Sequence, residues 1–467
     1  MPATDVVSSA DAAHLLRRAG YGGSPSEIAA LTGRTRAECV AAVMGFEDGD
    51  PVPAGPDVAT PGWVANDEQW QVHEQIIEWW VERMAGLPNP TVAPTNAPAT
   101  AGDLPIFERL AFFWHDHFAC SQEKLFDIEA MWAQLGIFRR MGMGNFADLT
   151  RAVSIDSAML VALDNQFNTV DEPQENFGRE LMELYTCGVG HFTEADVVAM
   201  TRAWTGHVTR GWNHVEEFWD STYEYRSEYH DHAQKTLFGI TANWNGVAQH
   251  AGERDTIDEL VYGVRQTETA ERIAGLLFRY FADLRADSAT ISELAQVFIA
   301  SDMEISALLR AVLEHDDFWA ESAHWAQVKN PMDWIVSVVQ RTGLSPSVFG
   351  LRWRMENMGM VPLDPPSVAG WGKGMAWLNT ASAWARGGFA ESLRWREELD
   401  GVFVGLENLS RENAVDTILA YYGIEDPSSA TRDRLMEWFD DAHAGHRWSI
   451  PHQARMLGAL VPEFQVY

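Results

Sequence analysis

Residues 106–141 have the sequence IFERLAFFWHDHFACSQEKLFDIEAMWAQLGIFRRM. Apolar residues recur along this stretch at helical spacing and no proline interrupts it, so it predicts two helices. The same spacing returns in 70–84, in 176–185 and in several pieces of 256–344. We therefore expect a mainly α fold, a multi-helical single body with long loops.

One segment, 205–255, departs from this helical pattern, because aliphatic residues are scarce in it while aromatic, His, Asp and Glu residues abound. Within it Tyr223, Tyr225 and Tyr229 alternate with charged residues, the period-two pattern typical of a strand. We expect a long functional loop that holds one small β-hairpin. The predicted regions are N-terminal helices with a proline-rich connection (1–104), a central helical core with the aromatic loop (105–255), a second helical half with a glycine-rich loop (256–400) and C-terminal helices (401–467).

The chain is strongly acidic, with 34 cationic residues, 67 anionic residues and a formal charge of −33. This charge argues against nucleic acid and against an anionic membrane surface as partners. No apolar run reaches the ~20 residues of a membrane span, and the first residues do not have the pattern of an export leader. We therefore expect a cytoplasmic protein, or an exported one if a leader was removed.

Only four lysines occur: Lys124, Lys235, Lys329 and Lys373. Arginine supplies the other cations, so we expect these lysines where a compact ammonium group is needed.

The motif FWHDHF in the first helical stretch contains His115 and His117, which are candidate metal ligands. Imidazole is the commonest protein ligand for transition metals. Residues two apart lie about 200° apart around a helix, so both rings reach one ion only if the helix ends or bends here. In the alternative interpretation His117 is an interior histidine and His115 a surface one.

Two carboxylates, Glu180 and Glu183, share a face of the helix predicted over 176–185. Such a pair can divide into a general acid and a general base, or bridge a metal ion. Glu175, Arg179 and Glu183 are also spaced for an ion-pair ladder, which favours a solvated face instead.

The segment 230–235, HDHAQK, gathers His230, Asp231 and Lys235 inside the aromatic loop. A histidine oriented by a carboxylate suits general base catalysis, and a lysine can stabilise a developing anion. The alternative is a polar loop that caps local structure.

The segment 365–374, PPSVAGWGKG, is an irregular loop rich in glycine. Glycines let a backbone approach a ligand closely, and Trp371 is a candidate stacking surface beside Lys373. Its spacing matches neither a Walker A loop nor a dinucleotide-binding fingerprint.

Seven blocks of the chain together resemble, in order, the large bacterial family catalogued as domain of unknown function 1800. They are HLLRRAGYGGSPSEI (14–28), ERLAFFWHDHFA (108–119), AMLVALDNQ (158–166), ENFGRELMELYTCGVGHFTEADVVAMTRAWTGH (175–207), HDHAQKTLFG (230–239), VKNPMDWIV (328–336) and PPSVAGWGKGMAWLN (365–379). The family commonly has Asn where this chain has Gln174 and Ser367. The resemblance covers about 12–390 and implies no assigned reaction; the blocks add Asp164, Asn165 and Trp204 as candidate substrate-binding residues.

Three hypotheses follow for the function. The first is a hydrolase in which Glu180, Glu183, His230 and Asp231 supply acid and base, and Arg179 and Lys235 stabilise the anion. In one version of this hypothesis a divalent metal ion activates water. The 20 tryptophans favour a polar substrate, a saccharide or an ester. The second is an iron- or copper-dependent redox enzyme that uses the same histidines and glutamates. The third is a helical binding or scaffold protein whose polar clusters are buried networks.

Overall fold

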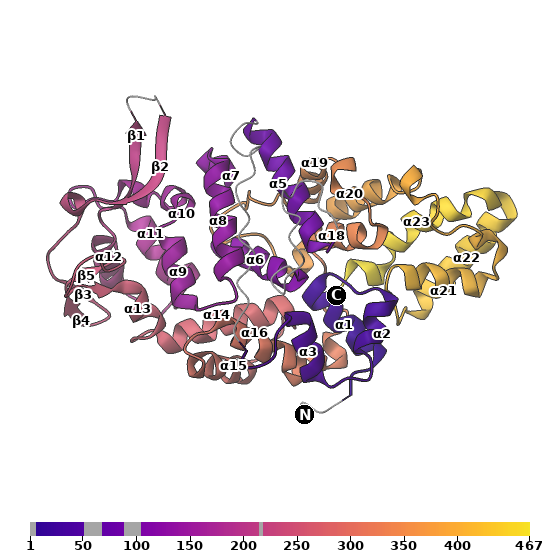
Figure 1. Cartoon of the computed structure of the whole chain (residues 1–467), viewed down its shortest axis with the longest axis horizontal. Helices are drawn as coiled ribbons and strands as arrows, with labels where there is room; N and C mark the ends of the chain where they lie inside the picture. The colour runs from indigo at the N-terminus through magenta and orange to yellow at the C-terminus, as the bar shows by residue number, and fades with distance from the viewer. Residues whose placement is uncertain (1–5, 51–67, 88–103, 214–217) are drawn as a thin grey trace.

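The computed structural model describes residues 6–50, 68–87, 104–213 and 218–467. It is mainly α-helical, which confirms the predicted fold class. Figure 1 shows an elongated body with a β-hairpin at one end and the C-terminal helices at the other. None of the described helices is both long enough and apolar enough to cross a membrane.

The first helices have their start signals in the sequence. Ser8, Ser24 and Thr35 each accept a hydrogen bond from the backbone three residues on, where an acidic side chain bonds back. Such capping boxes satisfy amide groups that a helix start leaves open. The helices of this part are α1 (Ser9–Gly20), α2 (Pro25–Leu31), α3 (Arg36–Met44) and α5 (Gln69–Met84). Most of the predicted proline-rich connection that follows lies outside the described residues.

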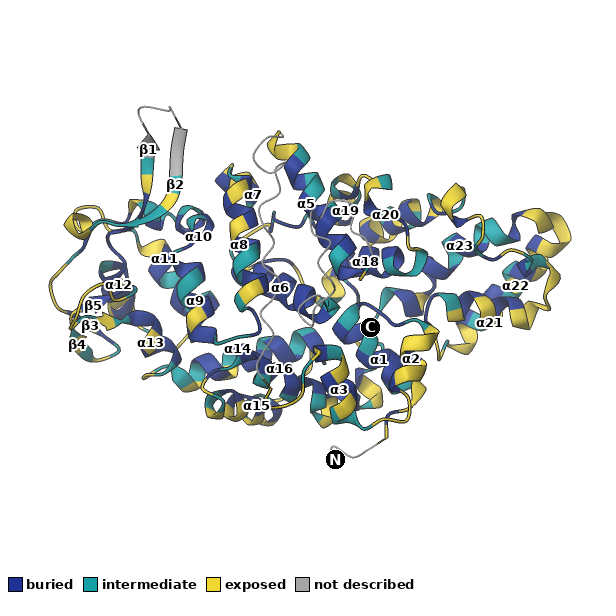
Figure 2. Cartoon of the chain, in the orientation of Figure 1, coloured by how far each residue is buried: buried dark blue, intermediate teal, exposed yellow. Residues whose placement is uncertain are grey.

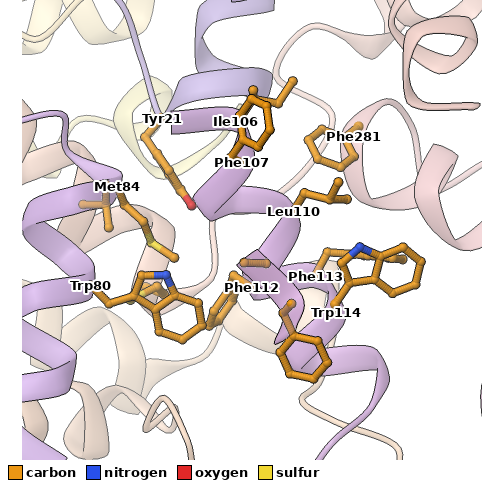
Figure 3. Close-up of a cluster of buried hydrophobic side chains, with 14 of the residues drawn as sticks. Tyr21, Trp80, Met84, Ile106, Phe107, Leu110, Phe112, Phe113, Trp114 and Phe281 are labelled. Atoms are coloured by element: carbon orange, nitrogen blue, oxygen red, sulfur yellow. The ribbon is translucent and has the colours of Figure 1, made fainter. Parts of the chain in front are cut away.

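Helix α6 (Pro105–His117) lies near the centre of the body, and Figure 2 shows that it is buried on nearly every side. Figure 3 shows the apolar side chains around it, among them Trp80, Phe112 and Trp114, which are all buried. Fully burying one large apolar side chain contributes roughly 1.5–3 kcal/mol. The end of α6 is therefore a rigid place from which to present a side chain.

The stretch 106–141 forms three helices rather than the predicted two: α6, α7 (Gln122–Leu125) and α8 (Ile128–Met141). Phe126 adopts a left-handed conformation (φ 53°), which ends α7. Asp127 then begins α8 by accepting a hydrogen bond from the Ala130 amide at 3.0 Å. The sequence does not show this break, because phenylalanine is not a turn-forming residue.

The next part carries all the strands of the described residues. Its helices are α9 (Phe146–Ser154), α10 (Ser157–Ala162), α11 (Glu175–Glu180), which continues as a π-helical turn (Leu181–Tyr185), and α12 (Glu194–Ala203). Its strands are β1 (His207–Asn213), β2 (Phe218–Tyr225), β3 (Lys235–Leu237), β4 (Ile240–Ala242), β5 (Trp244–Asn245) and β6 (Arg254–Asp255), paired in chain order as three two-stranded sheets.

The antiparallel pair β1–β2 is the predicted hairpin, with His207 opposite Tyr225 and an irregularity between Thr209 and Gly211. Tyr223 lies in β2 with Tyr225, as predicted. Tyr229 does not, because the chain turns into a short 3-10 helix whose Tyr229 amide donates to the Arg226 carbonyl at 3.0 Å.

The rest of the chain is helical with irregular connections. Its helices are α13 (Thr256–Val261), α14 (Gln266–Phe281), α15 (Ser288–Ala300), α16 (Ile305–Glu314), α17 (Asp316–Trp319), α18 (Pro331–Thr342), α19 (Leu351–Met358), α20 (Thr380–Glu391), α21 (Arg411–Tyr421), α22 (Ser429–Gly445) and α23 (Ile450–Leu460). The glycine-rich loop lies between α19 and α20, and returns to the end of α6.

Candidate functional site

The end of α6 forms one wall of a cavity of ≈ 350 Å³, which is the size of a small-molecule site. Its other walls come from α14, from the start of α18 and from the glycine-rich loop. The apolar lining includes Phe112, Phe113, Leu276, Tyr280, Trp371 and Trp377. The charged and titratable lining residues are Arg109, Asp116, His117, Arg272, Arg279, Asp333 and Lys373.

Asp116 fixes the glycine-rich loop to α6. Its Oδ1 accepts a hydrogen bond from the Trp371 amide at 2.9 Å, and its Oδ2 contacts the ammonium group of Lys373. Gly370 passes so close to Asp116, with φ at 79°, that a side chain at 370 would clash with the carboxylate and the backbone. The loop therefore requires glycine at this position.

His115 also holds this loop. Its Nε2 accepts a hydrogen bond from the Leu363 amide at 3.0 Å, so the ring proton is on Nδ1. Its ring packs edge-on against Trp371 at 5.3 Å, and Trp371 stacks on Phe112 at 5.7 Å. His115 is thus the more buried histidine of the two, and the expectation that it lies on the surface is wrong.

His117 lines the cavity and has a fixed tautomer. Its Nε2 lies 3.1 Å from the carbonyl oxygen of Tyr185; a carbonyl only accepts, so Nε2 carries the proton and Nδ1 is free to accept. Burial, with a smaller contribution from the charge of Arg272, lowers the pKa of His117 to about 3. His117 is therefore neutral at physiological pH.

The two histidines have different hydrogen-bond partners, and their role as metal ligands stays a prediction. The Nε2 atoms of His115 and His117 bond to backbone groups of different segments, at Leu363 and Tyr185. Within the described residues, no three His, Cys, Asp or Glu side chains converge in a way that could hold a metal ion.

The π-helical turn 181–185 shapes the wall beside His117. The carbonyl of Leu184 accepts hydrogen bonds from Nε and Nη2 of Arg272, at 3.0 and 2.8 Å. The carbonyl of Tyr185 accepts the bond from His117. A π-helical turn is rare and often lies at a functional site. Here it presents two carbonyls to side chains of the cavity.

The cavity is positively charged in a strongly acidic chain. Asp116 is paired with Lys373, and Asp333 lies 3.6 Å from Arg109. No carboxylate of the described residues forms an ion pair with the two remaining cations, Arg272 and Arg279. The balance of the charged lining is therefore about two positive charges.

Comparison with known families agrees with the resemblance in the sequence. A family model described as "Protein of unknown function (DUF1800)" matches residues 14–466. The chain belongs to the DUF1800 family. No curated protein and no solved structure matches it.

Four of the DUF1800-like blocks contribute to the cavity. Block 108–119 contributes Asp116 and His117, block 175–207 contributes Leu184, block 328–336 contributes Asp333, and block 365–379 contributes Trp371 and Lys373. The two candidate substrate-binding residues of the glycine-rich loop thus line the cavity.

The carboxylate pair of this DUF1800 chain lies outside the cavity lining. Burial, with the charge of Glu183, raises the pKa of Glu180. Arg179 forms a bidentate ion pair with Glu194 at 2.9 and 2.7 Å and lies 3.6 Å from Glu175. Arg179 is thus part of an ion-pair network on the surface. Leu184, on the same turn as this pair, does line the cavity.

The HDHAQK segment also lies outside the cavity lining. Its His230, Asp231 and Lys235 form a closed network, in which each side chain is hydrogen-bonded to other groups of the protein. Lys235 is buried, and its ammonium group donates to the carbonyls of Asp231 and Trp244 and lies 3.5 Å from Nε2 of His230. These three acceptors use all three protons of the ammonium group. Burial lowers the pKa of Lys235 to about 8. The carboxylate of Asp231 accepts from Arg202 at 2.6 Å.

The other three substrate-binding candidates have structural partners. Asn165 donates to the carbonyl of His207 at 2.8 Å, and the indole of Trp204 donates to Thr256 at 3.1 Å. Asp164 lies on the surface, 3.3 Å from Lys124. None of these three residues lines the cavity.

The cations of the cavity are not predicted by the sequence patterns. Arg272, Leu276, Arg279 and Tyr280 are spaced i, i+4, i+7 and i+8, so they share one face of α14. The one feature of these two cations in the sequence is that they are arginines within an apolar helical stripe. The same pattern occurs where the aliphatic part of an arginine side chain covers apolar surface, so it does not identify a cavity residue.

Proposed function

We propose that the chain is an enzyme that binds a small anionic molecule with an apolar body in this cavity and hydrolyses it. The observation that carries the binding half is the pair Arg272 and Arg279, cations that form no ion pair with a carboxylate of the described residues. An acidic protein gains no general benefit from cations placed in an apolar cavity. A bound anion gives them a partner.

The apolar walls set the other property of the ligand. Trp371 and Phe112 form a stacked pair, and Leu276 and Tyr280 extend the surface along α14. Ligand sites of this kind obtain much of their affinity from apolar contact and their orientation from a few polar groups. A compact anion without an apolar part would leave most of the cavity in contact with water.

Hydrolysis is the reaction class that the cavity's titratable groups support. In the proposed step, Nδ1 of His117 takes a proton from a water molecule, the oxygen attacks the acyl carbon, and the Lys373 ammonium group protonates the departing oxygen. Burial makes free His117 a weak base. The positive charge of Arg272 contributes to the low pKa of His117. A bound anion that pairs with Arg272 would cancel this contribution and so raise the pKa of His117.

A binding experiment tests the first half. We expect octanoate to bind at least tenfold more tightly than the neutral octanamide in isothermal titration calorimetry. The double variant Arg272→Gln, Arg279→Gln should lose this difference. Arg434→Gln is the matched control, because Arg434 is a surface cation paired with Glu437. Equal affinity of octanoate and octanamide for the wild type would refute the proposal.

A kinetic experiment tests the second half. With p-nitrophenyl monoesters of dicarboxylic acids as substrates, His117→Gln should lower turnover by about 10²-fold or more. Glu180→Gln serves as the comparison, since Glu180 lies outside the cavity lining. Loss of turnover in Glu180→Gln but not in His117→Gln would move the chemistry to the glutamate pair.

The proposal on partners rests on the charge of −33. We propose a small-molecule or saccharide ligand and no nucleic-acid partner.

A further inference from the structure

One end of the cavity holds polar groups that the proposed function does not use. Arg109, Asp333 and Tyr467 line this end and are buried, with exposed fractions of 1%, 1% and 3%. Within the described residues, Nε and Nη1 of Arg109, Oδ1 of Asp333 and the hydroxyl of Tyr467 have no hydrogen-bond partner. Buried polar atoms are nearly always paired, so four unpaired atoms around one cavity end indicate a binding role.

Aromatic rings and an asparagine side chain contact these polar side chains. The guanidinium of Arg109 lies against the rings of Tyr21, Tyr280 and Tyr467, at 4.8, 5.2 and 4.8 Å. Asn330 begins α18 and binds Asp333 twice, since its Oδ1 accepts from the Asp333 amide and its Nδ2 donates to Oδ2, both at 2.8 Å. Only Oδ1 of Asp333 is therefore left open.

The unpaired atoms have a defined chemical character. Nη1 of Arg109 lies 3.6 Å from Oδ1 of Asp333, which is longer than a hydrogen bond. One is a donor and the other an acceptor. A single group that both accepts and donates, placed beside the two, would satisfy both atoms.

Three other cations act on Asp333, namely Lys329, Arg18 and Arg386. Arg18 donates to the carbonyls of Phe281 and Ala282, and Arg386 donates to the carbonyl of Lys329 at 2.6 Å. They add positive charge to this end of the cavity, and Nη1 of Arg18 and Nε of Arg386 have no hydrogen-bond partner within the described residues. A second anionic group on the ligand would gain from that charge, but it would also face the carboxylate of Asp333.

We propose that this end of the cavity binds a hydroxyl group, which accepts from Arg109 and donates to Asp333. The inference rests on the proposed function and specifies its substrate class as a hydroxylated organic anion with an apolar segment between its polar groups. Since the polar atoms are buried, a side-chain rotation in this wall must accompany binding.

Three ligand series test the proposal in the wild-type protein by isothermal titration calorimetry. They are ω-hydroxyalkanoates of six to ten carbons, n-alkanoates with one carbon more, and α,ω-dicarboxylates. Each hydroxy acid has an alkanoate of equal length, which keeps the apolar contact constant. We expect the hydroxy acid to bind at least fivefold more tightly at one length.

The outcomes separate this inference from the proposed function. Alkanoates that bind as tightly as their hydroxy partners overturn the hydroxyl site and leave the anion site standing. Dicarboxylates that bind most tightly also overturn it, and show an anion site at both ends. If no series binds, the proposed function fails and this inference fails with it.

A variant pair tests the assignment to these residues. Asp333→Asn should reduce the preference for the hydroxy acid to less than twofold while alkanoate binding persists. Asp416→Asn, at an exposed acid paired with Arg432, is the matched control. Should Asp333→Asn not fold, Tyr467→Phe is measured instead, with a smaller reduction expected. A preference that both variants retain in full would overturn the assignment.

Discussion

The two contacts of Asp116 with the glycine-rich loop predict how much local opening of this loop increases when Asp116 or Lys373 is replaced. Asp116 binds the loop in two ways, through the Trp371 amide and through Lys373. Lys373 is about half exposed, so its ion pair contributes about 0–1 kcal/mol. The amide bond is buried, and leaving the Trp371 N–H unpaired costs about 1–3 kcal/mol. The two bonds can therefore be separated by mutation.

We expect Asp116→Ala to destabilise the local closed state of the loop by about 2–3 kcal/mol, because it removes both bonds. Lys373→Met should cost at most about 1 kcal/mol. Asp116→Asn should lie between the two, since its amide oxygen still accepts from Trp371 but has no charge.

Hydrogen exchange measured by mass spectrometry reads this directly in a peptide that spans Trp371. A factor of ten in exchange corresponds to about 1.4 kcal/mol of opening free energy. Asp116→Ala should speed exchange about 30- to 160-fold, and Lys373→Met about fivefold or less. If Lys373→Met matches Asp116→Ala, the ion pair and not the amide bond attaches the loop. Unchanged exchange in Asp116→Ala would refute the whole argument.

Three further predictions concern residues around the cavity and the closed network. Gly370→Ala should destabilise the protein, because of φ 79° and the clash with Asp116, whereas Gly387→Ala in α20 has open space and should stabilise it by about 0.5–1 kcal/mol in urea unfolding. The pKa of His117 is about 3 in the folded state and 6.5 in the unfolded state. As the pH falls from 6.5 toward 3, the unfolded state binds a proton that the folded state does not bind, so the free energy of unfolding decreases. Unfolding curves of His117→Gln should lack this part of the pH dependence. Lys235→Met should destabilise the protein by about 2–3 kcal/mol and leave octanoate binding intact. The control Lys124→Met, at a half-exposed surface lysine, should have little effect on either. Loss of octanoate binding in Lys235→Met alone would show that the HDHAQK network and the cavity are coupled.

The individual helices could be predicted well from the sequence, but the contacts between distant segments could not. Periodicity located α6 and α5, because one apolar face per helix is a local property. The FWHDHF motif indicates its two histidines as candidate residues, but it does not indicate Asp116, which lies between them. The importance of Asp116 depends on Gly370 and Trp371, which lie far away in the chain. No local pattern shows which loop reaches the end of a helix.

The same limit explains why HDHAQK is a candidate site from the sequence although it does not line the cavity. His, Asp and Lys close together in a sequence satisfy any motif for acid–base chemistry. In the structure each of them has a partner: His230 donates to the Thr205 carbonyl at 2.8 Å, Asp231 accepts from Arg202, and Lys235 has three acceptors. A group whose hydrogen bonds are all made within the protein has little left to offer a substrate. The number of unused donors and acceptors, which only the structure gives, separates the two cases.

The scarcity of lysine acquires a physical interpretation from this comparison. Lys235 and Lys329 are both buried, the first among acceptors and the second 4.5 Å from the ring of Phe464. Lys373 has one carboxylate partner and otherwise faces the cavity. A compact ammonium group fits all three sites, where the wider, planar guanidinium of arginine would need more space. Lys124 differs, because it is half exposed at the surface, and arginine is also buried in this chain, for example at Arg18 and Arg109. Residue type alone therefore does not mark a confined cation. Whether a confined cation serves the fold or a ligand depends on how many of its three protons the protein already uses.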